Sequence, residues 1–330
     1  MITFRSFLRS LTIFTAALFL IPPLPALARE TGRIFVSNER SHTVWVFSPE
    51  FEHIATIETS RRPRDMKLNG DRTLLYVACG DDDVIDIIDV ETLEIVDSIP
   101  TGPSPEVFEF SPDESLLYVS NEEDSMLEII DLEARITIHY VPTGAEPEGV
   151  ITSEDGSTIY VTSEVADMVH VIEAAAGAVI DNIVVGTRPR RFVLTPTTNE
   201  LWVSAELSSE IYIIDRASNE ITEVLSFLPP GFRPEDVTPV GMTLTKDGSR
   251  GYISLGRANH IAVIDGISHE IIDYVLVGRR AWSIALTRDE KLAVVANGLS
   301  DDITLIDTES LRPIRSIPVG QVPHTIIIDD

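Results

Sequence analysis

Six residues whose side chains could bind a ligand or transfer a proton stand at one position of a repeated sequence unit. They are Arg64, Glu106, Glu148, Arg190, Trp282 and His324, and another copy of the unit has Val240 there. Guanidinium groups hold carboxylate or carbonyl oxygens through charge-assisted hydrogen bonds, and an indole ring offers a stacking face. A histidine near glutamates could in principle carry out acid–base chemistry. The set predicts a binding site for a small anionic or carbonyl ligand or for a partner group. The alternative is a solvated lining.

No other motif for catalysis or metal binding accompanies these residues. The sequence has no GxSxG, HExxH, GxGxxG or P-loop pattern, and its other histidines lack ligand spacing. Cys79 is the single cysteine, which excludes an intrachain disulfide, a CxxCH haem site and a cysteine-based zinc site. Acidic runs such as Asp81–Asp83 lack the glycine and spacing of a calcium loop. We expect no catalytic residue, no metal and no cofactor.

The shared position follows from a repeat of about 42 residues that fills most of the chain. The copies begin at Ile34, Leu75, Leu117, Ile159, Leu201, Gly251 and Leu292. In one copy, four short runs at 84–89, 95–99, 107–110 and 116–120 are separated by turn sequences rich in Gly, Pro, Asp and Ser. Four antiparallel strands make one propeller blade. The repeat therefore predicts an all-β, seven-bladed β-propeller over residues 29–330, with four-stranded antiparallel blades.

Two recurring residue types of the unit have a structural interpretation. An aromatic residue in second place, such as Tyr76, is expected to pack between blades, and an acid such as Asp89 is expected to cap a hairpin turn. The charged residues at the shared position have a different environment, because they stand on the inner strands. These strands converge on one axis, so residues about 42 apart in sequence come together at one mouth of the channel. Residues two places earlier add Arg62, Glu146, Arg188 and Arg280.

The two ends of the chain carry complementary parts of one unit. After Gly320 the chain supplies the third run, 322–328, and stops, whereas the mature chain opens on the fourth run at Ile34. We expect the termini to share one blade and so close the ring without an open blade edge. The fifth copy is longer than its neighbours, with extra sequence within 225–240. This insertion is either a tolerated loop or part of a site, and both interpretations stay open.

The first 28 residues have the three parts of a secretory signal peptide. Arg5 and Arg9 precede an apolar run at 11–21, and Ala26-Leu27-Ala28 follows. We expect cleavage after Ala28, export to the periplasm and no membrane span in the mature chain; an uncleaved anchor is the alternative. Loss of the two arginines changes the formal net charge from −28 to −30. Such a charge disfavours nucleic acid and anionic membranes as non-specific partners. We expect a monomer.

The strings LYVACGDDDVIDIIDVET, LYVSNEEDSMLEIIDLEA and VANGLSDDITLIDTESLRPIRSIPVGQVPH resemble the YVTN family of β-propeller repeats over the whole mature chain. The tyrosine-valine-threonine-asparagine string is never spelled in full, and its last residue is kept only in Asn38, Asn121 and Asn297. Within that family, the organisation of this chain, a signal peptide followed by seven copies of the repeat, is similar to that of propeller proteins associated with pyrroloquinoline quinone (PQQ)-dependent alcohol catabolism in Gram-negative bacteria. The resemblance implies an accessory role in that oxidation or its transport system.

Two functions are compatible with these observations. The first is an exported, non-catalytic binding or assembly module that takes a periplasmic protein partner or a small ligand. The second is a propeller enzyme, either a lactonase-like hydrolase or a dehydrogenase subunit, that uses the histidine, glutamates and arginines at the channel mouth. The absence of a catalytic motif favours the first function, although the fold alone supports both.

Overall fold

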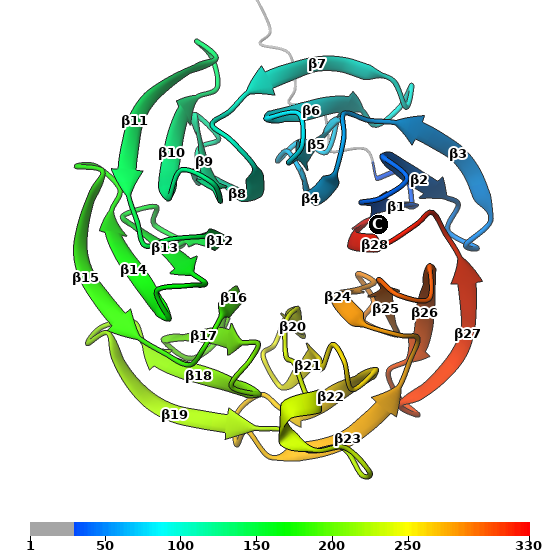
Figure 1. Ribbon diagram of the computed structural model, residues 1–330. Coiled ribbons are helices and arrows are strands. Elements are labelled where there is room, and N and C mark those ends of the chain that lie inside the picture. Colours follow the sequence, from blue (N-terminus) through cyan, green and yellow to red (C-terminus); the bar gives the residue numbers. More distant parts are fainter. Residues whose placement is uncertain (1–29) are drawn as a thin grey trace, which may run out of the picture.

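Short β-branched runs separated by turn sequences form strands in nearly every part of the chain that is described. The computed structural model describes residues 30–330, which contain strands β1 to β28 and one short 3-10 helix, η1 (Pro234–Asp236). The strands make seven four-stranded antiparallel sheets that stand around a central axis (Figure 1). The predicted seven-bladed propeller is therefore confirmed. The predicted signal peptide lies outside the described residues.

The blades are numbered by their order around the ring, and the strands of each blade are named from the innermost to the outermost (Figure 1). Blade 1 contains β28 (Pro323–Asp329), β1 (Arg33–Asn38), β2 (Thr43–Phe47) and β3 (His53–Glu58); blade 2 contains β4 (Pro63–Leu68), β5 (Leu74–Cys79), β6 (Val84–Asp89) and β7 (Ile95–Pro100); blade 3 contains β8 (Pro105–Phe110), β9 (Leu116–Asn121), β10 (Met126–Asp131) and β11 (Ile136–Pro142); blade 4 contains β12 (Pro147–Thr152), β13 (Thr158–Ser163), β14 (Met168–Glu173) and β15 (Ala178–Val184). Blade 5 contains β16 (Pro189–Leu194), β17 (Glu200–Ala205), β18 (Glu210–Asp215) and β19 (Glu220–Ser226); blade 6 contains β20 (Met242–Leu244), β21 (Arg250–Ser254), β22 (His260–Asp265) and β23 (Ile271–Leu276); blade 7 contains β24 (Ala281–Leu286), β25 (Leu292–Asn297), β26 (Asp302–Asp307) and β27 (Arg312–Pro318).

The hydrophobic core lies between neighbouring blades. Tyr76 of β5 packs against Phe108 and Phe110 of β8, and the rings of Tyr76 and Phe110 meet edge to face at 5.0 Å. Phe35 of β1 packs in the same way against Leu75 of blade 2. These contacts confirm that the aromatic residue in second place joins adjacent blades, and burial of such rings is a large favourable term in folding.

The turn between the third and fourth strands of a blade is capped by the recurring acid. The Asp89 carboxylate accepts hydrogen bonds from the backbone N–H groups of Glu91 and Thr92 at 3.0 and 2.7 Å. The same side chain-to-backbone bond occurs at Asp131, Asp215, Asp265 and Asp307. The structural interpretation of these acids is confirmed, because they satisfy turn N–H groups.

Most inner strands begin with a β-bulge. Hydroxyl groups of the second strand, in the same blade and in the preceding blade, stabilise it. The register of β16 against β17 shifts between Pro189 and Phe192, so two consecutive residues face one residue of β17. Similar shifts open β4, β8, β12 and β24. In blade 4, the Thr162 hydroxyl accepts the N–H of Gly149 at 2.7 Å and donates to the Arg190 carbonyl of blade 5 at 3.1 Å. One hydroxyl thus fixes the bulge of its own blade and the inner strand of the next.

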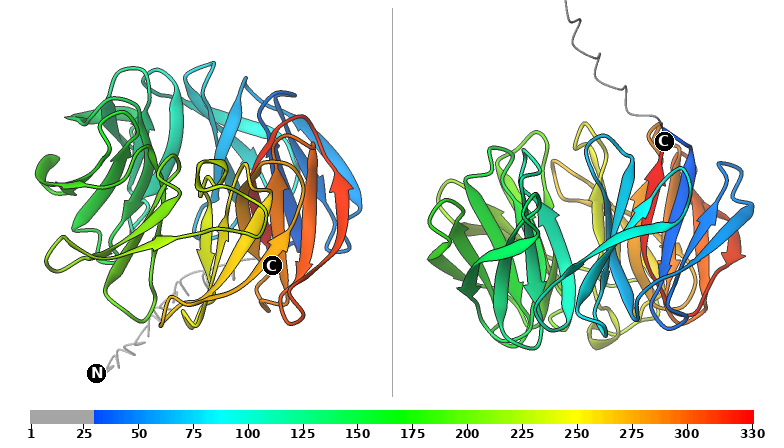
Figure 2. Two further views of the ribbon diagram at one scale, coloured as in Figure 1. Left: turned by 60° about the horizontal axis from the view of Figure 1, so that its bottom comes forward. Right: turned by 90° about the horizontal axis from the view of Figure 1, so that it is seen from above.

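The ring closes through β28, which pairs antiparallel with β1 from Arg33↔Asp329 to Asn38↔Pro323. In Figure 1 the red C-terminal strand lies beside the blue N-terminal strand, and Figure 2 shows the same closure from two other sides. The N–H of Gly32 also donates to the Asp329 carbonyl at 2.7 Å. The predicted shared blade is confirmed, and β28 covers the edge of β1 that would otherwise be unpaired where the ends meet. Within residues 30–330, no helical segment has the length and apolar character of a membrane span.

Removal of the closing strand should destabilise the whole ring. A chain that stops after Gly320 lacks β28 and therefore exposes one edge of β1 and the apolar cluster that contains Ile326. We expect a lower midpoint in thermal unfolding and a loss of cooperativity, followed by circular dichroism. An unchanged midpoint would contradict the closure.

Candidate functional site

The six candidate residues lie at the start of the inner strands, at one mouth of the central channel. Arg64, Glu106, Glu148, Arg190, Trp282 and His324 come from β4, β8, β12, β16, β24 and β28. All except Trp282 are less than a tenth exposed. Val240 also is buried, but it precedes the shortened strand β20. The structure therefore gathers the six residues as the repeat predicts, and it places them inside the protein.

Arg64 is the centre of one half of this cluster. Its guanidinium forms an ion pair with Glu106, which also accepts a hydrogen bond from Arg62 at 2.8 Å. Its Nη2 lies 3.7 Å from Glu148 Oε1. The two carboxylates come from different blades, so the guanidinium links blades 2, 3 and 4 by charge.

His324 is held as a neutral acceptor. Both Nε and Nη2 of Arg64 lie 3.3 Å from His324 Nε2, and Arg191 Nη2 lies 3.4 Å from the same atom. Because arginine only donates, Nε2 is the acceptor and the ring proton is on Nδ1, 2.9 Å from the Thr325 hydroxyl. Burial lowers the pKa of His324 well below its usual value, and the nearby arginines lower it further. The lone pair that a general base would use is already engaged.

Arg190 is the centre of the other half. It forms an ion pair with Glu164, and its Nη2 lies 3.2 Å from Glu148 Oε1. Arg191, the second residue of the bulge, binds the same Glu148 oxygen at 3.1 Å. Because of the bulge, the consecutive residues Arg190 and Arg191 both direct their guanidinium groups toward the Glu148 carboxylate.

Three residues of this cluster are missing from the sequence prediction: Glu164, Glu206 and Arg191. Glu206 accepts a hydrogen bond from Arg280 at 2.7 Å, and Glu164 accepts one from Arg188 at 2.6 Å. A signal for the acids exists, because glutamate follows the second strand in four copies, at Glu39, Glu122, Glu164 and Glu206. No comparable signal marks Arg191, since its direction depends on the bulge.

Two guanidinium groups lie over the ring of Trp282. The Arg190 and Arg280 carbons Cζ lie 5.1 and 4.9 Å from the centroid of its ring. Its ring also lies 5.5 Å from that of His324. The predicted stacking face is therefore used within the chain, in cation–π contacts that are strongest when water is excluded.

The carboxylates of the cluster differ in their tendency to ionise. Burial raises the pKa of Glu106 well above its usual value despite the adjacent Arg64. Burial acts in the same direction on Glu148, but the Arg190, Arg191 and Arg64 charges outweigh it and lower its pKa. Burial and the Glu148 charge raise the pKa of Glu164 to about 7. The mouth is thus a closed network in which Arg64 and Arg190 already bind carboxylates. That these six residues bind a ligand stays a prediction.

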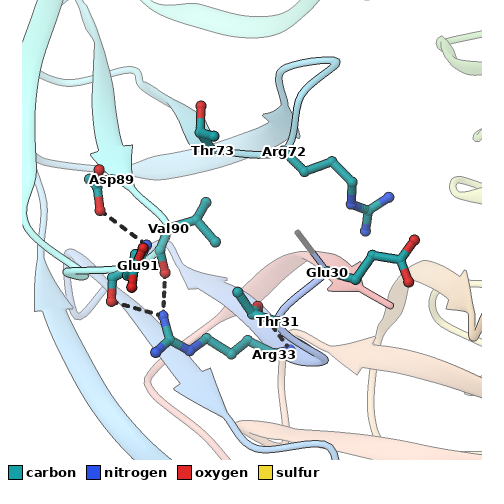
Figure 3. Close-up of a pocket in the computed structure, with 8 residues that line it drawn as sticks. All are labelled: Glu30, Thr31, Arg33, Arg72, Thr73, Asp89, Val90 and Glu91. Atoms are coloured by element: carbon teal, nitrogen blue, oxygen red, sulfur yellow. Dashed lines mark hydrogen bonds between the residues drawn. The ribbon is translucent and has the colours of Figure 1, made fainter. Parts of the chain in front are cut away.

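A separate pocket of about 340 Å³ lies where the start of the described chain crosses blade 2, away from this mouth (Figure 3). Arg33 reaches the carbonyls of Val90 and Glu91 there, the latter at 3.2 Å. Arg72 is turned to Asp329, with Nε and Oδ1 2.6 Å apart. These bonds attach the N-terminal segment to the ring, so Arg33 and Arg72 in the pocket wall have a structural role within the chain. Among residues 30–330, no group of three or more His, Cys, Asp or Glu side chains is arranged to hold a metal ion.

Comparisons with known proteins support the fold. The sequence profile of the YNCE-like beta-propeller family matches residues 41–158, and no curated protein matches the chain in sequence. A Kuenenia stuttgartiensis hydrazine synthase chain is similar in structure, with 20% identity, a TM-score of 0.76, and 89% of this chain and 99% of that chain covered. The Pseudomonas aeruginosa periplasmic gluconolactonase PpgL has 16% identity, a TM-score of 0.78, and coverages of 89% and 98%. The dihydro-heme d1 dehydrogenase NirN, in complex with DHE, has 16% identity, a TM-score of 0.70, and coverages of 94% and 78%. At such identities the likenesses establish the propeller fold.

Loss of one buried charge should cost far more stability than loss of a surface charge. Arg64→Met leaves the buried Glu106 without its closest cation, and we expect a loss of about 3–5 kcal/mol in the free energy of unfolding. The matched control is Arg61→Met, because the Arg61–Asp82 pair is on the surface, with the Arg61 side chain 60% exposed. We expect a much smaller loss there, because water screens an exposed ion pair. Urea unfolding measures both. Equal losses would show that the Arg64 network is not a buried structural unit.

The raised pKa of Glu164 should make stability depend on pH. A carboxyl whose pKa is raised in the folded state binds more protons when folded, so its contribution to stability falls as the pH rises from about 4.5 to about 7. Glu164→Gln should remove this part of the slope, while Glu154→Gln, at an exposed carboxylate of lowered pKa, should keep it. Urea unfolding at several pH values measures the slopes. An identical slope in wild type and Glu164→Gln would contradict the assignment.

Proposed function

We propose that the chain is an exported, non-catalytic binding or assembly module that docks a periplasmic protein partner on its channel-mouth face. The observation that carries the proposal is an arc of exposed apolar and arginine side chains around the mouth, over blades 4 to 7. The mouth itself is closed by the ion-pair network, so the surrounding loops are the accessible part of this face.

The arc occupies one repeat position. It is the second residue of the loop between the second and third strands of a blade, or the third residue in blade 6, where β21 ends one residue earlier. In blades 1, 2 and 3 this residue is charged: Arg40, Asp81 and Glu123. In blades 4 to 7 it is Val165, Leu207, Arg257 and Leu299. The three aliphatic side chains are 61%, 46% and 59% exposed. Aliphatic residues and arginine at this position are typical of a protein interface core, and they contrast with the acids at the same position in blades 2 and 3.

The insertion after β19 holds the centre of this arc. The N–H of Arg257 donates to the Thr238 hydroxyl at 2.8 Å, and the Ser209 hydroxyl donates to the Pro234 carbonyl. Gly256 has a φ of 43°, and a Cβ atom there would lie 2.1 Å from the Thr238 hydroxyl oxygen. The insertion therefore fixes the loops of blades 5 and 6 relative to each other. This gives it a positioning role in the proposed interface.

The network argues against the alternative of a propeller hydrolase or dehydrogenase subunit. His324 Nε2 accepts from arginine, and Glu106 lies between Arg62 and Arg64, so neither is free to abstract a proton. The similar structures include a periplasmic gluconolactonase, which makes lactone hydrolysis the specific alternative to test. We expect no lactone hydrolysis above that of a His324→Gln variant. A wild-type activity that this variant loses would support the enzyme.

Photo-crosslinking from the face tests the proposed docking. A photoreactive residue at Leu207 or Leu299 should give one discrete adduct in the periplasm of the producing bacterium. The same residue at Glu123, which has the equivalent position in blade 3, or at Ile138 on the outer strand β11, should not. Adducts that are absent from the arc, or equal at all four sites, would contradict the proposal.

Export is part of the proposal and has its own measurement. The exported chain should begin at Arg29, which mass spectrometry of the periplasmic protein measures. A mature protein that begins at Met1 would contradict it. The accessory role in PQQ-dependent alcohol oxidation rests on the sequence resemblance, and the identity of the crosslinked partner tests it.

A further inference from the structure

A small polar cavity lies in the channel directly beneath the closed network. It measures about 150 Å³, and its wall includes the second bulge residue of four inner strands, Asp65, Arg191, Ser283 and Thr325, together with Gly241 at the equivalent place before β20. Trp282 and His324 of the network also line it, and Phe192, Met242 and Ile284 complete it. The cavity thus combines one cation, one carboxylate, hydroxyl groups and an apolar side.

The wall contains two buried donors that the chain leaves without an acceptor. Arg191 Nη1 and Trp282 Nε1 have no hydrogen-bond partner in the protein. The other end of the Arg191 guanidinium is fixed by Glu148 at 3.1 Å, so the orientation of this group is already set. Buried donors are nearly always satisfied, and a bound acceptor next to this wall would satisfy them.

The carboxylate of Asp65 has accepting capacity left on the other side of the cavity. It accepts one hydrogen bond, from the Phe108 N–H at 3.3 Å. The nearest lysine, Lys67, is bound to Glu109 at 3.1 Å rather than to Asp65. A ligand hydroxyl could therefore donate to Asp65 while an acidic group of the same ligand meets Arg191.

Blade 6 provides the space. Gly241 of this blade corresponds to the second bulge residue of the other blades, and a Cβ atom there would lie 2.5 Å from the Trp282 carbonyl oxygen. A larger residue would push β20 and β24 apart and fill the channel at this level. The glycine therefore keeps both the close approach of the two strands and the cavity.

Toward the face opposite the network, the same strands carry a second cavity with basic side chains around it. The next residues along these strands, Thr243, Leu244 and Leu286, line this cavity of about 330 Å³. Arg72, Lys246 and Arg288 lie around that cavity, together with Glu290 and Asp330. Cations on this face raise the local concentration of small anions near an otherwise acidic protein.

We propose that the channel cavity binds a small hydroxycarboxylate, with the carboxylate facing Arg191 and Trp282 and the hydroxyl facing Asp65. A cavity of about 150 Å³ is the size that holds a molecule such as benzene, so acids of roughly four to six heavy atoms fit. Arginine recognises the carboxylate by charge-assisted hydrogen bonds. The hydroxyl provides specificity, because an acid without it offers no donor to the Asp65 carboxylate in the cavity wall. This site is independent of the proposed partner surface.

Glycolate and lactate are the probes, and acetate and propionate are the matched acids without a hydroxyl. Titration of the mature protein should give a saturable change in tryptophan fluorescence and heat with the hydroxy acids, and affinities weaker by about tenfold or more with the others. Arg191→Gln should weaken glycolate binding about tenfold or more. Trp282→Phe should weaken it with the ring retained, and Asp65→Asn should reduce the preference for the hydroxy acids. Arg216→Gln, at an arginine paired with Glu154 away from the channel, is the control and should bind as wild type does.

Thermal unfolding of each variant, measured alongside, separates lost binding from lost folding. The proposal is overturned if wild type shows no saturable response to glycolate or lactate up to about 10 mM. It is also overturned if folded Trp282→Phe and Arg191→Gln bind with wild-type affinity. Photo-crosslinking at Leu207 should be the same in Trp282→Phe, so that failure of the ligand site and failure of the partner surface are distinguishable.

Discussion

Charge pairing inside the central channel is the constraint on which the arrangement of this propeller depends. A guanidinium removed from water is stable only beside carboxylates that satisfy it, because the desolvation cost of an unpaired buried charge is several kcal/mol. Here the partners come from different blades. Arg64 of blade 2 pairs with Glu106 of blade 3, and Arg190 of blade 5 pairs with Glu148 and Glu164 of blade 4. The network therefore fixes the relative positions of inner strands that share no backbone ladder. It complements the apolar clusters, which join the same blades farther from the axis.

The sequence contains enough information for the fold because its main signals are local and repeated. A turn acid such as Asp89 binds N–H groups two and three residues on, and an aromatic such as Tyr76 faces the next blade by strand alternation. The closing strand could be predicted as well, since the two chain ends carry complementary parts of one unit. The repeat also predicts that the six candidate residues gather at one mouth of the channel.

The pairing inside the ring could not be predicted in the same way. Whether Arg64 faces a ligand or Glu106 depends on side-chain directions across blades, which no periodicity encodes. Arg191 joins the network because a bulge turns it toward the channel, and Ser204 accepts its N–H at 3.0 Å to keep that bulge. The departure from symmetry in blades 4 to 7 is visible in the sequence as Val165, Leu207 and Leu299, but only the fold places these residues on one face. An exposed apolar residue alone carries little information.

A double-mutant cycle on Arg190 and Glu164 tests most directly the claim that the mouth is closed by mutual charge pairing. The variants are Arg190→Met, Glu164→Leu and the combination, each measured by urea unfolding at a pH well above the Glu164 pKa of about 7, where this carboxyl is ionised. If the two groups satisfy each other, each single variant loses stability and the double variant loses less than their sum, with a coupling of about 1–3 kcal/mol. Additive losses would contradict the account, because they would mean that the two side chains are held independently and that the arginine is free for another partner.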